Sequence, residues 1–482
     1  MNKIEKNIFW SLACLNALFL VYWTGLSLNY RLHFDDVHYM ADMQRMSIWE
    51  FIVLRYMTIG GNFSTYWTDA VVDKIAVLVG DFSIWPLVMY GIGIWMTFSA
   101  IEHHIRSIKP AMLFMIVVLI YNIYILTSID LAVFTWLCAM AYYLLGPMLL
   151  LLLSYLNREQ LEWWRWCIML FLGIYIAGTW VSFPPVALSV MFVNGMWLWR
   201  KHEWSIKQAW SDIRIKKIVL MAIVMINLFV ISVIAPGNYA RYDNADAEGF
   251  VHLTSISQYL YGMGAAMIQY GYFMVFYLPY HLLILCIGAY FGTKSSVEFS
   301  TPKYRIIIYL LLAFVGYLIL SVLPMVYVYG GFGVYRTYNH VCFVYAIMFA
   351  AIGYILGMGR DKTKILHIAT YGLMTMMAII MCVNVCIDLP VVRAYAKAQD
   401  ERKAYLLQLK AEGNTAPVYV DRYPSTATPD AKYWVWRMLG KSAPMPTLYY
   451  ESDASPVYII PYKNLYGIDF DIIVKTDDIN NN

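Results

Sequence analysis

Two adjacent aspartates, Asp35 and Asp36, stand in the stretch "RLHFDDVHYM", directly after the first long apolar run of the chain. Carboxylates at the edge of a hydrocarbon region are costly unless they are paired or hydrated, so such a pair indicates a functional site. In a partly dry site one carboxylate can act as a general base while the other holds a cation or orients a donor group. The alternative interpretation is that the two aspartates mark the solvated end of a helix.

Two histidines flank this acidic pair, His33 on one side and His38 on the other. Imidazole and carboxylate are both ordinary ligands of divalent metals. If the site uses a metal such as Mg²⁺ or Mn²⁺, we expect Asp35, Asp36 and His38 to hold it, and the sequence leaves open whether it does. It indicates no other cofactor.

The composition indicates a membrane protein, because 61% of the 482 residues are hydrophobic and only 14% are charged. Soluble domains usually carry about 25% charged residues. Apolar runs approach the roughly 20 residues needed to cross a bilayer. They predict an all-α polytopic domain over 1–387 with about eleven membrane helices, at 7–28, 82–101, 110–127, 131–156, 166–180, 184–199, 218–235, 270–291, 306–323, 341–358 and 365–387.

The distribution of lysine and arginine predicts the orientation of these helices. Eighteen cations fall at the N-terminal side of the predicted spans and only six in the opposite loops. Short loops rich in Lys and Arg stay in the cytoplasm, so we expect a cytoplasmic N-terminus and an external, periplasmic C-terminus. The net charge of +4 is therefore a topology signal, and it does not indicate nucleic-acid binding.

The first external loop, residues 29–81, is long enough to hold structure of its own. Within it "SIWE", residues 47–50, has the pattern of a helix capping box. The apolar residues that follow lie on one side of a helix that is too short to span, and Gly60 and Gly61 predict its end. We therefore expect an amphipathic helix in the membrane interface.

After residue 387 the composition becomes more polar, which predicts a small α/β module over 388–482 on the external side. An amphipathic helix with Pro390 near its start is expected first. "PVYVDRY", "PVYII" and "FDIIV" are expected to form short strands, and "PDAKYWVWRML" a helix. A module of this size has a small hydrophobic core, so we expect it to pack against the membrane domain.

The motif "FDDVHY", residues 34–39, resembles the "FDEVHF" stretch that follows the first membrane helix of protein O-mannosyltransferases. More broadly it is similar to the acidic pair of the GT-C superfamily, multi-helix membrane glycosyltransferases that take a sugar from a polyprenyl-phosphate donor at the external face. The long loop, the interfacial helix and the external C-terminal module fit the same architecture. The resemblance implies that Asp35 is the catalytic carboxylate and Asp36 its partner.

A second motif, "APGNYAR" at 235–241, resembles an Ala-Pro-Gly-Asn…Arg pattern of uncharacterised bacterial membrane proteins of that superfamily. We expect Asn238 to form the turn and Arg241 to project at the membrane surface, where a guanidinium fork suits a phosphate. The alternative is a snorkelling arginine beside an ordinary turn.

Further residues are candidate members of the same external site. Arg336, with Tyr335 and His340 near it, has the same two interpretations as Arg241. Asp130 is a further acidic candidate, although a helix N-cap is the stronger reading of its position. One departure is that the stretch "GGNFST" lacks the Gly-Arg-aromatic element expected late in the first loop of bacterial relatives.

Together these features predict a bacterial inner-membrane glycosyltransferase. Its partners are expected to be a polyprenyl-phosphate sugar, the lipid bilayer and a glycan, lipid or protein acceptor, with inversion at the sugar. The alternatives are a transporter or flippase of lipid-linked sugars and an O-antigen polymerase or ligase. A transporter would carry charges along a path and matched broken helices in two halves, whereas the polar residues here gather on one face.

Overall fold

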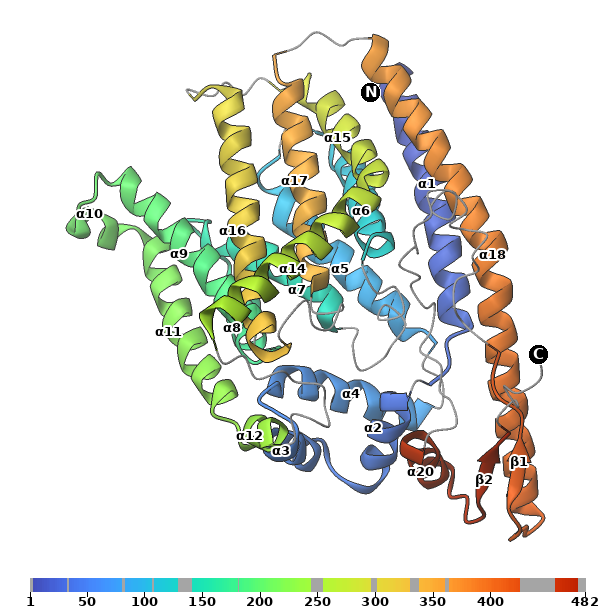
Figure 1. Ribbon diagram of the computed structural model, residues 1–482. Helices are drawn as coiled ribbons and strands as arrows, with labels where there is room; N and C mark the ends of the chain where they lie inside the picture. Colours follow the sequence, from blue (N-terminus) through green and yellow to red (C-terminus); the bar gives the residue numbers. More distant parts are fainter. Residues whose placement is uncertain are drawn as a thin grey trace.

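The protein is a nearly all-helical bundle with a set of short helices laid across one end (Figure 1). It is described here from a computed structural model. The structure describes residues 3–32, 34–79, 83–105, 108–128, 141–180, 182–243, 255–295, 301–329, 338–359, 364–424 and 456–475.

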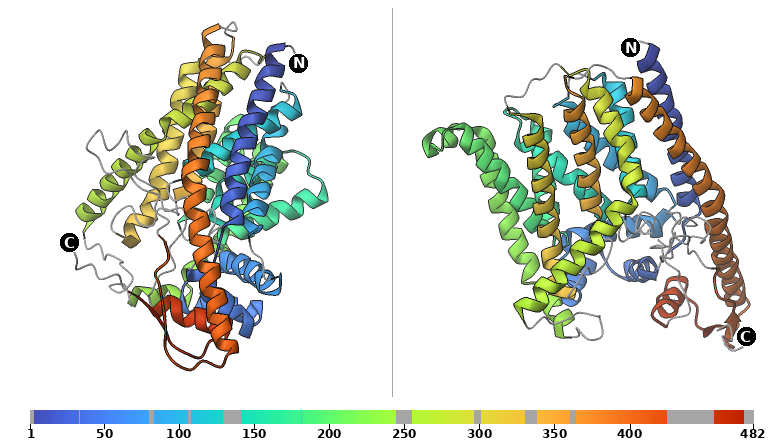
Figure 2. Two further views of the ribbon diagram at one scale, coloured as in Figure 1. Left: turned by 90° about the vertical axis from the view of Figure 1, so that its right-hand side faces the viewer. Right: turned by 45° about the horizontal axis from the view of Figure 1, so that its top comes forward.

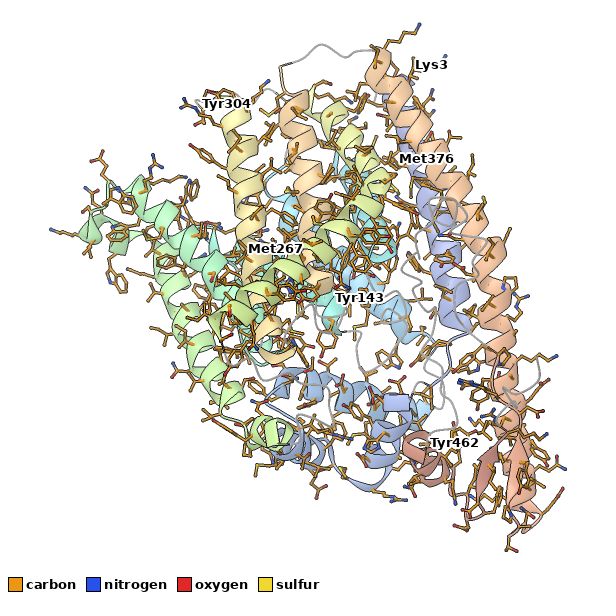
Figure 3. All side chains as sticks on the ribbon, viewed as in Figure 1. Lys3, Tyr143, Met267, Tyr304, Met376 and Tyr462 are labelled. Carbon is orange, nitrogen blue, oxygen red and sulfur yellow. The ribbon has the colours of Figure 1, made fainter. Side chains whose placement is uncertain are left out.

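The bundle consists of apolar helices that run between two ends of the molecule. Lys3 and Tyr304 lie at one end and Tyr462 at the other, as Figure 3 shows. We call the first the N-terminal end. The helices of the bundle are α1 (Lys3–Leu28), α5 (Trp85–Glu102), α6 (Pro110–Leu126), α7 (Ala141–Leu156), α8 (Trp163–Ala177), α9 (Phe183–Lys201), α11 (Ile213–Val233), α14 (Ile256–Phe276), α15 (Leu278–Gly292), α16 (Lys303–Tyr329), α17 (Asn339–Gly357) and α18 (Lys364–Ala411).

The helices confirm a multi-pass membrane protein. Within the described part of the chain, five of them are long and apolar enough to cross a bilayer (α1, α11, α16, α17 and α18), or up to six spans if the bent pair α14–α15 forms one. The apolar helices α6, α7 and α8 are shorter. The breaks predicted at "SFPPVA" and "APGN" are confirmed, since α9 begins at Phe183 and α11 ends at Val233.

The expected single span over 270–291 is not a straight helix. The structure has two helices, α14 and α15, with an angle of 64° between them. Pro279 stands in the first turn of α15, where its missing N–H and fixed φ favour starting a new helix over continuing the old one. Because residues 270–291 form one largely apolar run, the sequence predicts a single span there and not this bend.

Three short helices, α2 (Phe34–Arg45), α3 (Ile48–Thr58) and α4 (Phe63–Val79), lie across the end of the bundle opposite Lys3 (Figure 1). We call this the acidic end. The predicted capping box is confirmed, because the Ser47 hydroxyl accepts from the Glu50 amide and the Glu50 carboxylate accepts from the Ser47 amide. Trp49 and Met57 on α3 are exposed, as expected for a helix in the membrane interface.

The turn between α3 and α4 is fastened to the end of α11. The Asn238 side chain accepts from the Gly61 amide at 3.2 Å and donates to the Ser232 carbonyl at 2.8 Å. Ser232 Oγ donates to the Gly61 carbonyl at 2.8 Å. Gly237, in the short helix α12 (Pro236–Asp243), packs directly on Gly60. The motifs "GGN" and "APGN" therefore form one contact that fixes α3 and α4 against the bundle.

The chain continues from the last membrane helix into the C-terminal region without a break. α18 is one helix that passes through Pro390, and it runs alongside α1 (Figure 2). Tyr22 of α1 donates to Asp388 at 2.6 Å in the buried contact between them. The separate helix expected after residue 387 is therefore an extension of the preceding one.

The module at the C-terminus contains one parallel strand pair and a helix. β1 (Val418–Val420) pairs with β2 (Ile472–Val474), which confirms two of the expected strands. The predicted strand "PVYII" is wrong, because it begins α20 (Pro456–Tyr466). Short apolar runs do not separate strand from helix by periodicity, and here packing on α2 decides. The helix expected at "PDAKYWVWRML" lies outside the described residues.

The C-terminal region contacts the first loop. Gln44 of α2 donates to the Leu465 carbonyl at 3.1 Å, and Arg31 pairs with Asp400 of α18 at 2.5 Å. α20 thereby covers one side of α2.

Gly61→Ala tests the contact between the α3–α4 turn and α11. A Cβ at Gly61 would overlap the Ser232 carbonyl oxygen, so we expect a loss of about 1–3 kcal/mol of unfolding free energy. Thermal unfolding of the purified protein in detergent measures it. Gly91→Ala is the matched control, because nothing lies within 4 Å of its Cβ position. Equal midpoints for the two variants would contradict the contact.

Candidate functional site: a carboxylate cluster at the acidic end

Asp35 and Asp36 lie in the first turn of α2, where the helix dipole favours negative charge. Asp36 is fully buried, and its carboxylate accepts a hydrogen bond from the Tyr30 hydroxyl. Asp35 is only partly buried. Asp36 is therefore held inside the protein, whereas the Asp35 carboxylate is accessible to a reactant.

Two further aspartates, Asp69 and Asp73, complete a cluster of carboxylates. They are four residues apart on α4, so they share one face of that helix. Both are buried, and α4 packs against α2. Burial, and after it the negative charge of Asp36, raises the pKa of both side chains well above the ordinary value, while Arg55 acts in the opposite direction. These two carboxyls therefore favour their protonated form.

Asp73 is the most constrained member of the cluster. It is 0% exposed, and neither of its carboxylate oxygens has a hydrogen-bond partner among the described residues. An unpartnered buried carboxylate is costly, so this position is maintained at the expense of stability. Such a position is typical of a functional site.

Arg55 of α3 is the buried cation next to the cluster. It is 5% exposed, pairs with Asp42 at 2.6 Å and stacks on the Tyr39 ring at 4.3 Å. Asp42 of α2 also lies 3.7 Å from His38. Burial, followed by the charge of Arg55, lowers the pKa of His38, against the opposing effect of Asp42. Arg55 thus offsets part of the negative charge and ties α3 to α2.

The described residues do not assemble the metal site that the sequence left open. Among them, no three histidine, cysteine, aspartate or glutamate side chains come together as ligands of one ion. His38 is directed to Asp42 instead of completing a set with Asp35 and Asp36.

The structure describes only some of the other predicted site residues. Asn238 lies at the acidic end, where it clamps the α3–α4 turn. His340 is buried in the bundle, 2.8 Å from the Tyr317 hydroxyl and beside the Phe183 ring, and its described contacts are not with α2, α3 or α4. The remaining predictions lie outside the described residues or concern undescribed side chains: His33, Asp130, Arg241, Tyr335 and Arg336.

Sequence reasoning missed Asp69, Asp73 and Arg55 as members of the site. A signal was available, because "TDAVVDK" places two carboxylates four residues apart in an otherwise apolar stretch. Only the packing of α4 on α2 shows that they face the first pair.

An apolar groove of about 580 Å³ opens between α3, α4, α8 and α11. Trp49, Phe63, Trp67 and Ile174 are among its lining residues. It lies along the N-terminal half of α4, on a different side of that helix from Asp69 and Asp73. The groove is suited to a hydrocarbon chain.

No protein-family model, no curated protein and no solved structure matches this chain. The likeness to membrane glycosyltransferases therefore rests on the motifs in the sequence.

Asp73→Asn is expected to stabilise the protein at neutral pH. Because the folded-state pKa of Asp73 is raised, the unfolding free energy falls by about 1.4 kcal/mol per pH unit between the ordinary pKa, about 3.9, and the raised one. Asparagine removes this loss, so the variant should unfold at a higher temperature at pH 7 and at a similar one near pH 4.

Thermal unfolding in detergent at several pH values measures this difference. Asp471→Asn is the control, because that carboxylate is 77% exposed and pairs with Lys463. A gain for Asp73→Asn that is the same at every pH would contradict a buried, protonated carboxyl.

Proposed function

We propose that the protein is an inner-membrane glycosyltransferase that transfers a sugar from a polyprenyl-phosphate donor to a glycan, lipid or protein acceptor. The acidic end would face the periplasm, with the N-terminus in the cytoplasm and all eleven predicted segments belonging to the membrane domain. The observation that carries the proposal is the difference in burial within the acidic pair. Asp35 is partly exposed, whereas Asp36 is buried and accepts a hydrogen bond.

In the proposed reaction Asp35 is the general base. Its carboxylate takes the proton of the acceptor hydroxyl as that oxygen attacks the anomeric carbon. The bond between the anomeric carbon and the phosphate oxygen breaks, and its electron pair leaves with the polyprenyl phosphate. Attack opposite the leaving group inverts the anomeric configuration.

Asp36 and its tyrosine partner support this step by keeping a negative charge beside the base. The hydrogen bond from Tyr30 stabilises the charged form of Asp36 in a dry environment. Asp69 and Asp73, which favour the protonated form, limit the total negative charge that meets the phosphate of the donor. Arg55 compensates part of what remains.

The groove along α3 and α4 offers a place for the polyprenyl chain. Its lining is aromatic and aliphatic, and α3 presents exposed apolar residues to the surroundings. A chain held there would bring its phosphate to the acidic end, where Arg241 and Arg336 are the proposed contacts. Low local dielectric strengthens contacts between arginine and phosphate.

Asp35→Asn is expected to reduce transfer by about 10²–10⁴-fold, because an amide cannot accept the proton of the acceptor. The measurement is a proteoliposome assay with radiolabelled polyprenyl-phosphate sugars and whole membrane extract as acceptor. Asp471→Asn, a carboxylate change on the exposed surface, should keep full activity. Full transfer by Asp35→Asn would defeat the assignment.

The same assay separates the proposal from transport. Movement of intact lipid-linked sugar across the vesicle membrane, with no glycosidic bond formed, would favour a flippase.

Tyr30→Phe is expected to lower kcat by about 10-fold with little change in KM, because one hydrogen bond to a charged group is lost. Tyr259→Phe, whose hydroxyl donates to the Leu323 carbonyl, is the control. An unchanged kcat for Tyr30→Phe would exclude a role of this contact in the reaction.

A further inference from the structure

A second pocket, of about 430 Å³, opens where α5 and α7 end and α6 and α8 begin. Arg158 and Arg165 line it, together with His103 and the tryptophans Trp95 and Trp164. It lies far from the carboxylate cluster. The Ser27 hydroxyl at the end of α1 donates to the Ser83 carbonyl just before α5, so α5 begins near the acidic end and leads away from it.

Arg158 is a buried cation in the wall of this pocket. It is 7% exposed, its Nη2 donates to the Ser99 carbonyl at 3.1 Å, and its guanidinium lies 5.0 Å from the Tyr155 ring. Its Nε has no hydrogen-bond partner among the described residues. Arginine stays charged even when burial, and after it the charge of Arg165, lowers the pKa of Arg158.

Two carboxylates close to Arg158 in the sequence pair with other arginines. Glu162 pairs with Arg165 at 3.3 Å, and Glu159 lies 3.6 Å from Arg214. Glu102 lines the exposed rim of the pocket, and within the described part of the chain no carboxylate forms an ion pair with Arg158. The charges of Glu162 and Glu102 act on Arg158 only from a distance and raise its pKa less than burial lowers it. A buried cation without a directly paired anion is destabilising, so the site can accept one.

A second buried cation lies next to Arg158. Lys217 of α11 is 1% exposed, and its Nζ donates to the carbonyls of Tyr155, at 2.9 Å, and of Arg158. The Tyr155 carbonyl is in the last turn of α7, where the helix dipole attracts a cation, and the Arg158 carbonyl lies just beyond the helix. Lys217 is therefore satisfied by the backbone but adds positive potential behind the Arg158 guanidinium.

An apolar cavity of about 490 Å³ adjoins the cationic pocket. The two share Ile105, Ile108 and Leu113 in their walls. The cavity extends between α5, α6, α7, α15 and α17, with Ala351 and Phe291 in its lining. A charged pocket joined to a hydrocarbon-lined cavity matches an amphiphile with an anionic head and an acyl chain.

Exposed tryptophans around the pocket place it at the edge of the hydrocarbon region. Trp95 is 44% exposed and Trp164 is 38% exposed, and Trp163 beside it is 78% exposed. Tryptophan is enriched at the level of the lipid headgroups.

We propose that this pocket binds an anionic phospholipid of the leaflet at the N-terminal end, with the phosphate on Arg158 and Arg165 and one acyl chain in the adjoining apolar cavity. The phosphate supplies the missing counterion, and a guanidinium fork matches its oxygens. The site is independent of the proposed transfer reaction, since it lies at the other end of the bundle.

The test uses the full-length protein in a nonionic detergent, titrated with dioleoyl phosphatidylglycerol or dioleoyl phosphatidylcholine. Native mass spectrometry measures bound lipid, and thermal unfolding measures the stabilisation. We expect the anionic lipid to bind about 10-fold more tightly, a difference of about 1.4 kcal/mol. Arg158→Gln should abolish this preference, and Arg200→Gln, which changes an exposed cation outside both cavities, should keep it.

Ala351→Phe provides a second test that leaves Arg158 intact. A phenyl ring in the apolar cavity should reduce phosphatidylglycerol binding by filling the space for the acyl chain. Equal binding of the two lipids, an unchanged preference in Arg158→Gln, or undiminished binding in Ala351→Phe would overturn the proposal. So would stabilisation by inorganic phosphate as large as that by phosphatidylglycerol, because it would show a free-phosphate site.

Discussion

The burial of carboxylates at one end of an apolar helix bundle is the constraint on which the acidic end depends. Asp36 and Asp73 are both 0% exposed, and dry carboxylates are tolerated only with hydrogen bonds, compensating charge or bound protons. The structure uses all three. Tyr30 donates to Asp36, Arg55 lies near the cluster, and burial favours the protonated forms of Asp69 and Asp73.

Holding these groups together requires α2, α3 and α4 to keep fixed positions, although none of them spans the membrane. The contact between Gly61 and Ser232 and the clamp of Asn238 join the α3–α4 turn to α11. Gln44 of α2 contacts α20, and Arg31, just before α2, pairs with Asp400 of α18. The cluster is thus held from the membrane bundle and from the C-terminal module at once.

The two ends of the bundle differ in the kind of buried ionisable group that they hold. The acidic end holds carboxylates with raised pKa, and the opposite pocket holds Arg158 without a counterion. A polar headgroup region borders each end of a membrane bundle, so each end can meet a charged lipid. An anionic headgroup supplies the counterion that Arg158 lacks, whereas the carboxylates are suited to accepting a proton beside a donor that carries its own phosphate.

Local signals in the sequence determined the membrane class, the capped helix at Ser47, the breaks at Pro184 and Pro236, and the first acidic pair, because each depends on nearby residues. Tertiary packing decided the rest. The helix at "PVYII" and the burial of Asp73 depend on contacts between distant segments. Asp69 and Asp73 join Asp36 only because α4 packs on α2. Residue spacing along one helix does not encode which neighbour that helix will face.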